Sequence, residues 1–148
     1  RRVVLTPLAE SAPESVELLK FLWQACGAQV FEMSAAEHDG VFSAVSHVPH
    51  LLAFSYMNAV LDRHNAALCF DFAATGFRDF TRIAASHPEM WRDITLANKE
   101  AILLDLKANA AQLLVLIDCI ENHDALGLNE QIVRASTARN QWGRQSRS

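Results

Sequence analysis

Four polar side chains recur within one apolar stretch of the sequence, at Asp39, Ser43, Ser46 and His50. On a helix, where each residue turns by about 100°, these positions fall within a sector of roughly 60°. Carboxylate, hydroxyl and imidazole groups on one stripe can bind a polar ligand or exchange protons with it. The pattern favours a cleft-facing polar surface, although any one of these groups alone could equally bond a neighbouring side chain or backbone atom.

Pro49 lies beside the last of these residues. A proline removes one backbone hydrogen bond of a helix, so we expect the helix to kink or open locally next to His50. A metal site is the alternative reading of this stretch. His47 and His50 are three residues apart and Asp39 could join them, but the sequence contains no HExxH motif.

A second group of candidate residues lies between residues 75 and 93. Arg78 and Arg82 are four residues apart and would share one helical face, with Gly76 as a flexible approach just before that helix. The planar donors of an arginine match both oxygens of a carboxylate. Apolar sequence surrounds Arg82, which favours a ligand-binding arginine over an ordinary surface ion pair. Trp91, in the first turn of the next predicted helix, is more typical of a core residue.

Most of the elements that position these residues are predicted helices. Ser34 and Glu37, and again Ser86 and Glu89, have the spacing of a capping box and would each open a long helix. Residues 143–148 are expected to be disordered. The predicted helices cover residues 13–26, 34–64, 86–122 and 124–142, and two short strands cover residues 1–5 and 29–33. Four charged residues are predicted to be exposed to solvent: Asp62, Arg63, Asp105 and Lys107.

Composition bounds the class of protein. The chain has 148 residues, 51% of them hydrophobic, with a mean hydropathy of +0.06, which fits one domain with a helical core. The net charge of −4 gives no basic footprint for nucleic acid. No apolar run reaches the roughly 18 residues of a membrane span. Three widely spaced cysteines are typical of unpaired thiols in a reducing cytoplasm.

The predicted helix over residues 86–122 would be roughly 50 Å long, at about 1.5 Å per residue. A small domain does not need so long a helix. We therefore expect part of its apolar surface to pack against another subunit.

Four motifs follow one another along the chain: His38-Asp39, Ser46-His-Val-Pro-His50, GFRDFTRIAAS over residues 76–86, and Met90-Trp-Arg-Asp93 followed by Asn98. Together these motifs resemble the C-terminal domain of prephenate dehydrogenases. The order of the motifs and the gaps between them match as well as the motifs themselves, from about Val3 to about Trp142. The opening VVLTP resembles the stretch that leaves the family's nucleotide-binding domain.

The resemblance implies an all-α fold, a bundle of long helices preceded by a short strand that belongs to a missing Rossmann domain. Residues 1–33 would contain the end of the nucleotide-binding domain, a linker and one helix. Residues 34–142 would form the helical dimerisation and substrate-binding domain, and residues 143–148 a tail.

The implied reaction is the oxidative decarboxylation of prephenate to 4-hydroxyphenylpyruvate in tyrosine biosynthesis, with NAD or NADP, by a cytoplasmic homodimer. The family's dinucleotide-binding loop and catalytic histidine lie on the missing domain. This chain alone is therefore expected to be inactive and to contain no catalytic residue.

The resemblance also assigns roles to residues. Arg82 matches the arginine that holds a prephenate carboxylate, and His50 matches a pocket histidine that bonds polar groups of the ligand. The other residues implied at the substrate are Ser46, Thr75, Gly76 and Trp91. Four more residues are implied to organise the pocket: His38, Asp39, His47 and Arg78.

Several alternatives stay open. Thr75 stands where the family often has glycine, which is a departure from its pattern. Arogenate, with an amino group in place of the side-chain keto group, is an alternative substrate. A helical dimerisation or regulatory module without substrate chemistry is the alternative function, and the intact Arg82 and His50 argue against it.

Overall fold

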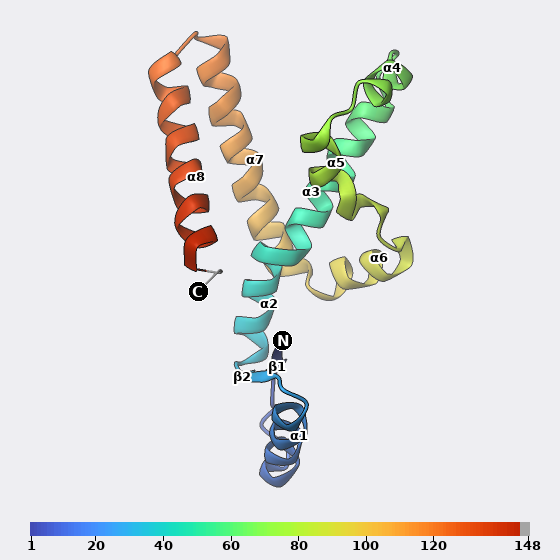
Figure 1. The fold of residues 1–148 in the computed structure, drawn as a ribbon, viewed down its shortest axis with the longest axis vertical. Coiled ribbons are helices and arrows are strands. Elements are labelled where there is room, and N and C mark those ends of the chain that lie inside the picture. Colours follow the sequence, from blue (N-terminus) through green and yellow to red (C-terminus); the bar gives the residue numbers. More distant parts are fainter. Residues whose placement is uncertain (146–148) are drawn as a thin grey trace. The chain divides into compact units, whose positions relative to one another are not determined.

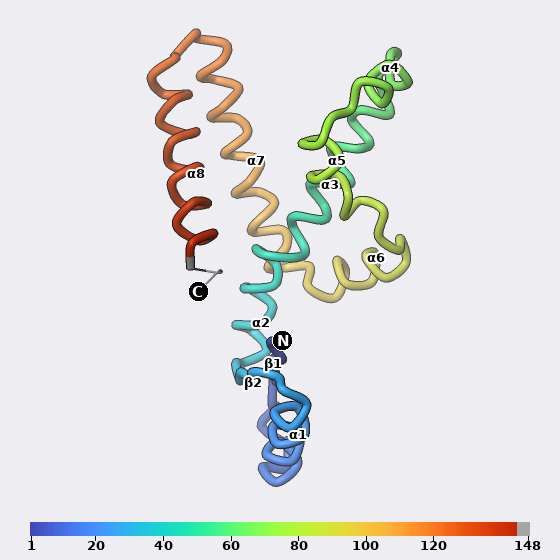
Figure 2. Tube along the Cα trace, in the orientation of Figure 1, coloured from blue at the N-terminus to red at the C-terminus, as the bar shows by residue number. Residues whose placement is uncertain are grey.

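The computed structural model describes residues 1–145, and most of them are helical (Figures 1 and 2). The predicted all-α class is confirmed, with one two-stranded sheet near the N-terminus. In chain order the elements are β1 (Arg2–Leu5), α1 (Pro13–Ala25), β2 (Gln29–Glu32), α2 (Ala35–Phe42), the π-helix η1 (Ser43–His47), α3 (Val48–Leu61), α4 (Ala66–Asp71), α5 (Thr75–Thr81), the 3₁₀-helix η2 (Arg82–Ala85), α6 (Pro88–Ala97), α7 (Lys99–Glu121) and α8 (Ala125–Gln145).

The chain divides into two compact units, residues 1–105 and residues 106–148. The first unit contains both strands and all helices up to the first turns of α7. The second contains the rest of α7 and α8. This division does not test the boundary predicted near residue 33, which stays a prediction.

The N-terminal segment forms a small β–α–β unit. β1 and β2 pair in parallel, with Val3 opposite Val30, and α1 makes the crossover that a parallel pair requires. Pro13 opens α1, and Gly27 follows it with φ of +78°. Glycine adopts this left-handed conformation without steric cost, so the chain can turn directly into β2.

The long helical stretch predicted from Ser34 is confirmed, but a π-helix interrupts it. Ser34 and Glu37 form the predicted capping box, with the Ser34 hydroxyl 3.2 Å from the Glu37 amide nitrogen. In η1 the Val48 N–H donates to the carbonyl of Ser43, five residues earlier. Pro49 follows at once and has no N–H to continue the α-helical pattern. The local opening expected beside Pro49 is this π segment.

The prediction of one helix over residues 86–122 is wrong. Asn98 leaves the helical conformation, with φ of −106° and ψ of 37°, and separates α6 from α7. The predicted capping box at Ser86 is also wrong, because the Ser86 hydroxyl donates to the carbonyl of Ile83 and His87 takes the N-cap position without a side-chain bond. At this break the Asn98 side chain forms hydrogen bonds to Asp39 and His47, which are far away in the sequence.

The end of the last helix also differs from the prediction. α8 runs to Gln145, so residues 143–145 are helical rather than disordered, and residues 146–148 lie outside the described part of the chain. None of the helices within residues 1–145 is both long enough and apolar enough to cross a membrane.

A polar contact lies within the core of the first unit. Ser43 is fully buried, and its hydroxyl donates to a carboxylate oxygen of Asp105 at 2.6 Å. Asp105 is half-buried, so its predicted exposure to solvent is wrong. The bond joins η1 to the first turns of α7, next to the fully buried Ile102.

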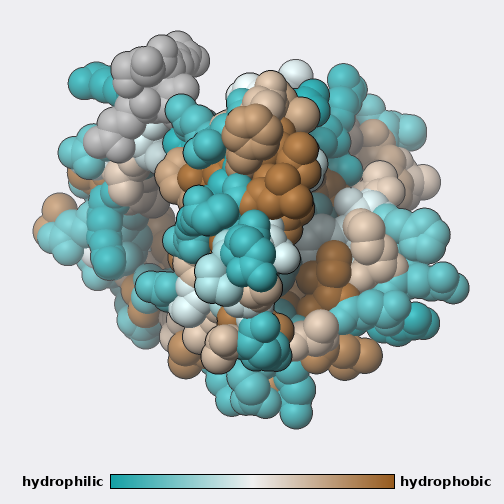
Figure 3. Space-filling view, turned by 90° about the horizontal axis from the view of Figure 1, so that it is seen from below, coloured by the Kyte–Doolittle hydropathy of each residue, from teal (hydrophilic) through white to brown (hydrophobic). Residues whose placement is uncertain are grey.

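Many large apolar side chains remain exposed. Figure 3 shows such side chains open at the surface among hydrophilic ones. On the two long helices they include Leu104, Leu114, Ile117 and Ile120 of α7 and Leu126 of α8, which is 79% exposed. Figure 1 shows α8 turning back from the end of α7.

The buried contact between Ser43 and Asp105 predicts a stability effect. Ser43→Ala removes a hydrogen bond to a charged group and should lower the free energy of unfolding by about 1.5–3 kcal/mol. Urea denaturation followed by circular dichroism measures the change. Ser136→Ala, which removes an exposed hydroxyl on α8, should change stability by less than about 0.5 kcal/mol. Equal effects of the two substitutions would contradict the assignment.

Candidate functional site

Two imidazoles and an indole meet where η1 and α3 face α6. The ring of His50 stacks on Trp91, with centroids 3.7 Å apart and planes inclined by 21°. His47 lies edge-on to the same indole at 6.1 Å. The edge-on geometry of His47 is a favourable one for aromatic pairs. We call His47, His50, Trp91 and Asn98 the imidazole cluster.

Asn98 completes this cluster from the break between α6 and α7. Its side-chain nitrogen lies 2.8 Å from the backbone carbonyl oxygen of Asp39 and 3.1 Å from Nδ1 of His47. Asn98 is only 9% exposed, and buried amide groups need such partners. One side chain thus ties the break to both α2 and η1.

His50 is held by a backbone group of its own helical segment. Its Nδ1 atom lies 2.8 Å from the carbonyl oxygen of Ser46. Ser46 therefore contributes its backbone to the cluster. Ser43 faces Asp105 instead, because the wider π turn does not keep the spacing of 100° per residue on which the predicted stripe rests.

Burial lowers the pKa of His47 from its ordinary value of 6.5. The charge of His38 acts in the same direction, the carboxylate of Asp39 opposes it, and His50 adds a smaller lowering effect. Desolvation disfavours the charged form of an imidazole, so His47 stays neutral to lower pH than a free histidine.

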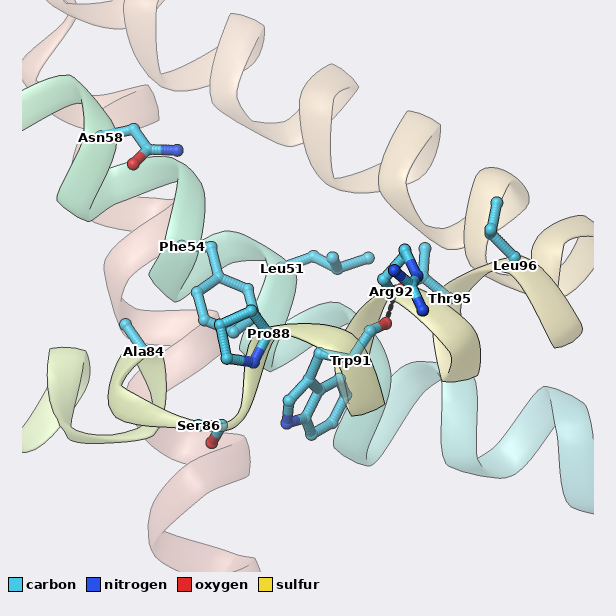
Figure 4. A pocket seen from close by; sticks show the side chains of 10 residues that line it. All are labelled: Leu51, Phe54, Asn58, Ala84, Ser86, Pro88, Trp91, Arg92, Thr95 and Leu96. Carbon is cyan, nitrogen blue, oxygen red and sulfur yellow. Dashed lines mark hydrogen bonds between the residues drawn. The ribbon is translucent and has the colours of Figure 1, made fainter.

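Trp91 also lines a cavity of about 550 Å³ between α3 and α6 (Figure 4). This volume is in the range of small-molecule sites. The indole Nε1 is the one buried side-chain polar atom without a hydrogen-bond partner in residues 1–145. Trp91 is the one predicted site residue among those that line this cavity. The others are Leu51, Phe54, Asn58, Ala84, Ser86, Pro88, Arg92, Thr95 and Leu96.

His38 and Asp39 form a pair on α2. Nδ1 of His38 lies 3.0 Å from Oδ1 of Asp39, and the imidazole stacks on Phe42 at 4.4 Å. Both side chains are partly open to solvent. His38 lines a second cavity beside the β1–β2 pair, which Arg2 and Phe31 also line.

The predicted arginine site lies on a neighbouring segment. Gly76 was predicted to lie just before this helix. α5 begins at Thr75, so Gly76 lies inside its first turn instead. α5 ends at Thr81 and Arg82 starts the 3₁₀-helix η2, so Arg78 and Arg82 do not share one α-helical face.

Both arginines are exposed, and neither guanidinium has a hydrogen-bond or ion-pair partner within residues 1–145. η2 and α5 pack on α3, the helix that carries His50. Tyr56 of α3 makes part of this contact, with ring centroids 5.5 Å from Phe80.

The metal alternative has no third ligand in the described part of the chain. Residues 1–145 contain no group of three or more His, Cys, Asp or Glu side chains placed to hold an ion. The Nδ1 atoms of His47 and His50 are both engaged with protein groups.

Sequence reasoning gave Asn98 no role in the site. A signal was present, because asparagine is a poor helix former that is common where helices end. The apolar pattern continues on both sides of Asn98, which concealed the break. Its partners at Asp39 and His47 could not be read from local sequence.

Comparison with known proteins identifies the class of this fold. Residues 34–134 match the family model described as the dimerization domain of prephenate dehydrogenase. The chain belongs to the prephenate dehydrogenase family. The matched range contains every residue of the imidazole cluster and both arginines, as the resemblance implied.

Individual relatives agree with this assignment. A prephenate dehydrogenase of Bacillus subtilis is 48% identical over 101 residues, covering 68% of this chain and 27% of the relative. A cyclohexadienyl dehydrogenase of Zymomonas mobilis is 33% identical over 139 residues, covering 93% of this chain and 47% of the relative. The crystal structure of A. aeolicus prephenate dehydrogenase with hydroxyphenyl propionate and NAD⁺ superposes with a TM-score of 0.86 at 34% identity, covering 95% of this chain and 49% of that one. This chain thus spans between about a quarter and a half of the length of these relatives.

The lowered pKa of His47 predicts a pH-dependent stability. The unfolded chain binds a proton at His47 near pH 6.5, whereas the folded chain binds one only at lower pH. The free energy of unfolding should therefore fall as pH drops below about 6.5 and be fully restored above it. Urea denaturation at pH 8 and pH 5.5 measures this decrease.

The contribution of His47 is isolated by substitution. His47→Gln should make the decrease between pH 8 and pH 5.5 smaller. His64→Gln, at an exposed histidine, is the matched control and should leave it as in the unaltered chain. A decrease that is the same in His47→Gln as in the unaltered chain would refute the assignment.

Proposed function

We propose that this chain is the substrate-binding and dimerisation part of an enzyme that oxidatively decarboxylates prephenate to 4-hydroxyphenylpyruvate. The observation that carries the proposal is the family match over residues 34–134, which includes the imidazole cluster and the unpaired Arg82. A scaffold kept only for subunit association has no need of a His–Trp–Asn cluster with half-buried histidines or of a free guanidinium.

The proposed binding residues follow from chemistry. Prephenate carries two carboxylates, and the exposed Arg82 guanidinium can bind both oxygens of one of them. His50 would bond another polar group of the ligand, and Trp91 would present its unpartnered Nε1–H beside it. Ser46, Thr75 and Gly76 complete the proposed contacts. His38, Asp39, His47 and Arg78 are proposed to organise the pocket.

The residues of this chain do not fit a nicotinamide dinucleotide. Such cofactors need a glycine-rich turn before a helix N-terminus to hold the phosphates, and the five glycines stand singly at positions 27, 40, 76, 127 and 143. We propose that NAD or NADP is held by a nucleotide-binding domain that lies mainly outside this chain. Residues 1–33 would form the end of that domain and the linker that follows it. The catalytic step would then depend on that domain.

A homodimer is proposed through the long helices. Apolar side chains such as Leu114, Ile120 and Leu126 are more than half exposed on α7 and α8, and contiguous exposed apolar surface marks association sites. Cys26, Cys69 and Cys119 are free thiols, which suits the proposed cytoplasmic location.

Arogenate is the second candidate substrate. The Zymomonas mobilis relative is named for cyclohexadienyl compounds, the ring class to which both prephenate and arogenate belong. The two ligands differ only at the side-chain keto or amino group. Measuring both in the same assay decides between them.

Arg82→Ala should weaken prephenate binding. A hydrogen-bonded charge pair contributes about 1.5–3 kcal/mol, so the dissociation constant should rise about 10- to 100-fold. Isothermal titration calorimetry measures it in the chain joined to its nucleotide-binding domain. Arg63→Ala removes an arginine that is exposed and bonded only locally to Asn65, and it should bind as tightly as the unaltered protein. A non-catalytic module predicts that none of the three proteins binds, and that result would exclude the proposed function.

The isolated chain should show no prephenate-dependent reduction of NAD or NADP, because it lacks the phosphate-binding turn. The same chain joined to its nucleotide-binding domain should be active. Absorbance of the reduced nicotinamide follows the reaction directly. Turnover by the isolated chain would show that residues 1–148 hold the cofactor after all.

A further inference from the structure

The Nδ1 atoms of the two clustered imidazoles face partners of opposite kind. His50 Nδ1 faces the carbonyl oxygen of Ser46 at 2.8 Å. A carbonyl only accepts, so Nδ1 of His50 carries the proton. His47 Nδ1 faces the side-chain nitrogen of Asn98 at 3.1 Å. An amide nitrogen only donates, so Nδ1 of His47 carries none.

The orientation of the Asn98 amide is fixed by a third group. The same amide nitrogen also lies 2.8 Å from the backbone carbonyl oxygen of Asp39. If the amide were turned by 180°, its oxygen would face that carbonyl oxygen, and two acceptors would meet in a buried place. Only the NH₂ group satisfies Asp39 and His47 at once. Asn98 therefore has no second arrangement that would suit a protonated His47.

We propose that Asn98 is a positioning residue that holds His47 with its proton on Nε2, while the Ser46 carbonyl holds His50 with its proton on Nδ1. The two neighbouring rings thus present one hydrogen-bond donor, His47 Nε2–H, and one acceptor, His50 Nε2. Neither Nε2 atom has a hydrogen-bond partner among residues 1–145. Unlike the Nε1 atom of Trp91, neither is fully buried.

The two histidines also differ in how they can take up a second proton. His50 can be protonated on Nε2 while its bond to Ser46 stays intact. His47 cannot be protonated on Nδ1 without losing its bond to Asn98. The titratable groups that act on His47 are His38, Asp39 and His50, and of these only Asp39 favours its charged form. The cluster is therefore asymmetric: His47 stays a neutral donor, and His50 can serve as an acceptor or, once protonated, as a cationic donor.

The consequence for ligand binding rests on the proposed function. A ligand oxygen that accepts hydrogen bonds suits His47 Nε2–H at all pH values where the cluster is folded. An anionic group such as a carboxylate suits His50 only together with a proton.

Imidazole ¹⁵N NMR spectroscopy tests the proposal on the chain labelled with ¹⁵N-histidine. Multiple-bond ¹H–¹⁵N spectra distinguish protonated from unprotonated ring nitrogens, and the spectra of His47→Gln and His50→Gln assign the signals. At pH 8 we expect His47 to be protonated on Nε2 and His50 on Nδ1. The same tautomer at both residues, or the reverse pattern, would overturn the proposal without the need for any variant of Asn98.

Asn98→Asp tests the role of Asn98 with almost no change in shape. A carboxylate accepts where the amide donated, so His47 should move its proton to Nδ1 or become charged, and its pKa should rise above that of the unaltered chain. The signals of His50 should keep their pattern. Asn140→Asp, on the exposed surface of α8, is the matched control and should change neither histidine.

An unchanged His47 tautomer in a folded Asn98→Asp chain would refute the positioning role. The spectra are recorded without ligand, so this result is independent of the proposed function. A chain that shows the expected tautomers but fails to bind prephenate would remove the proposed function and leave this inference standing.

Discussion

The hydrogen bonds of Asn98 join the two irregular stretches of backbone on which the candidate site depends. One stretch is the π-helix η1, which ends at His47, and the other is the break between α6 and α7. The Asn98 amide bonds to His47 and to the carbonyl of Asp39. These two hydrogen bonds favour the break at Asn98 over one regular helix from Pro88 to Glu121. An asparagine that satisfies two buried partners makes the irregular arrangement the stable one.

Much of the local structure could be predicted from the sequence. The two strands, the helix from Pro13, the capping box at Ser34 and the opening beside Pro49 all follow from residues within a few positions of one another. The break at Asn98 could not be predicted in this way, because its partners lie 51 and 59 residues earlier in the chain. The burial of Asp105 depends on Ser43, which is 62 residues away. Local pattern therefore identified most of the elements but not α4 (Ala66–Asp71). The partners of Asn98 and Ser43 lie too far away in the sequence for local pattern to reveal them.

The sequence predicted which residues form the candidate site better than it predicted how they are arranged. The motif around His47 and His50 and the position of Trp91 were identified, and the structure brings these three together. The regular polar stripe was predicted by assuming a continuous α-helix. The π segment interrupts that helix, so the stripe does not form. Arg82 lies on η2, and its place at a ligand shared with the cluster remains a proposal. The family assignment rests on the match over residues 34–134 and does not depend on that point.

The central claim is that a ligand of the prephenate class binds beside the imidazole cluster. ¹⁹F NMR spectroscopy of the chain joined to its nucleotide-binding domain, labelled with 5-fluorotryptophan, measures this directly at Trp91. This chain contains three tryptophans, Trp23, Trp91 and Trp142, and the spectrum of Trp91→Phe assigns the resonance. The account predicts that prephenate shifts the Trp91 resonance in a saturable manner and leaves those of Trp23 and Trp142 in place. A Trp91 resonance that does not move while prephenate is being turned over would contradict it.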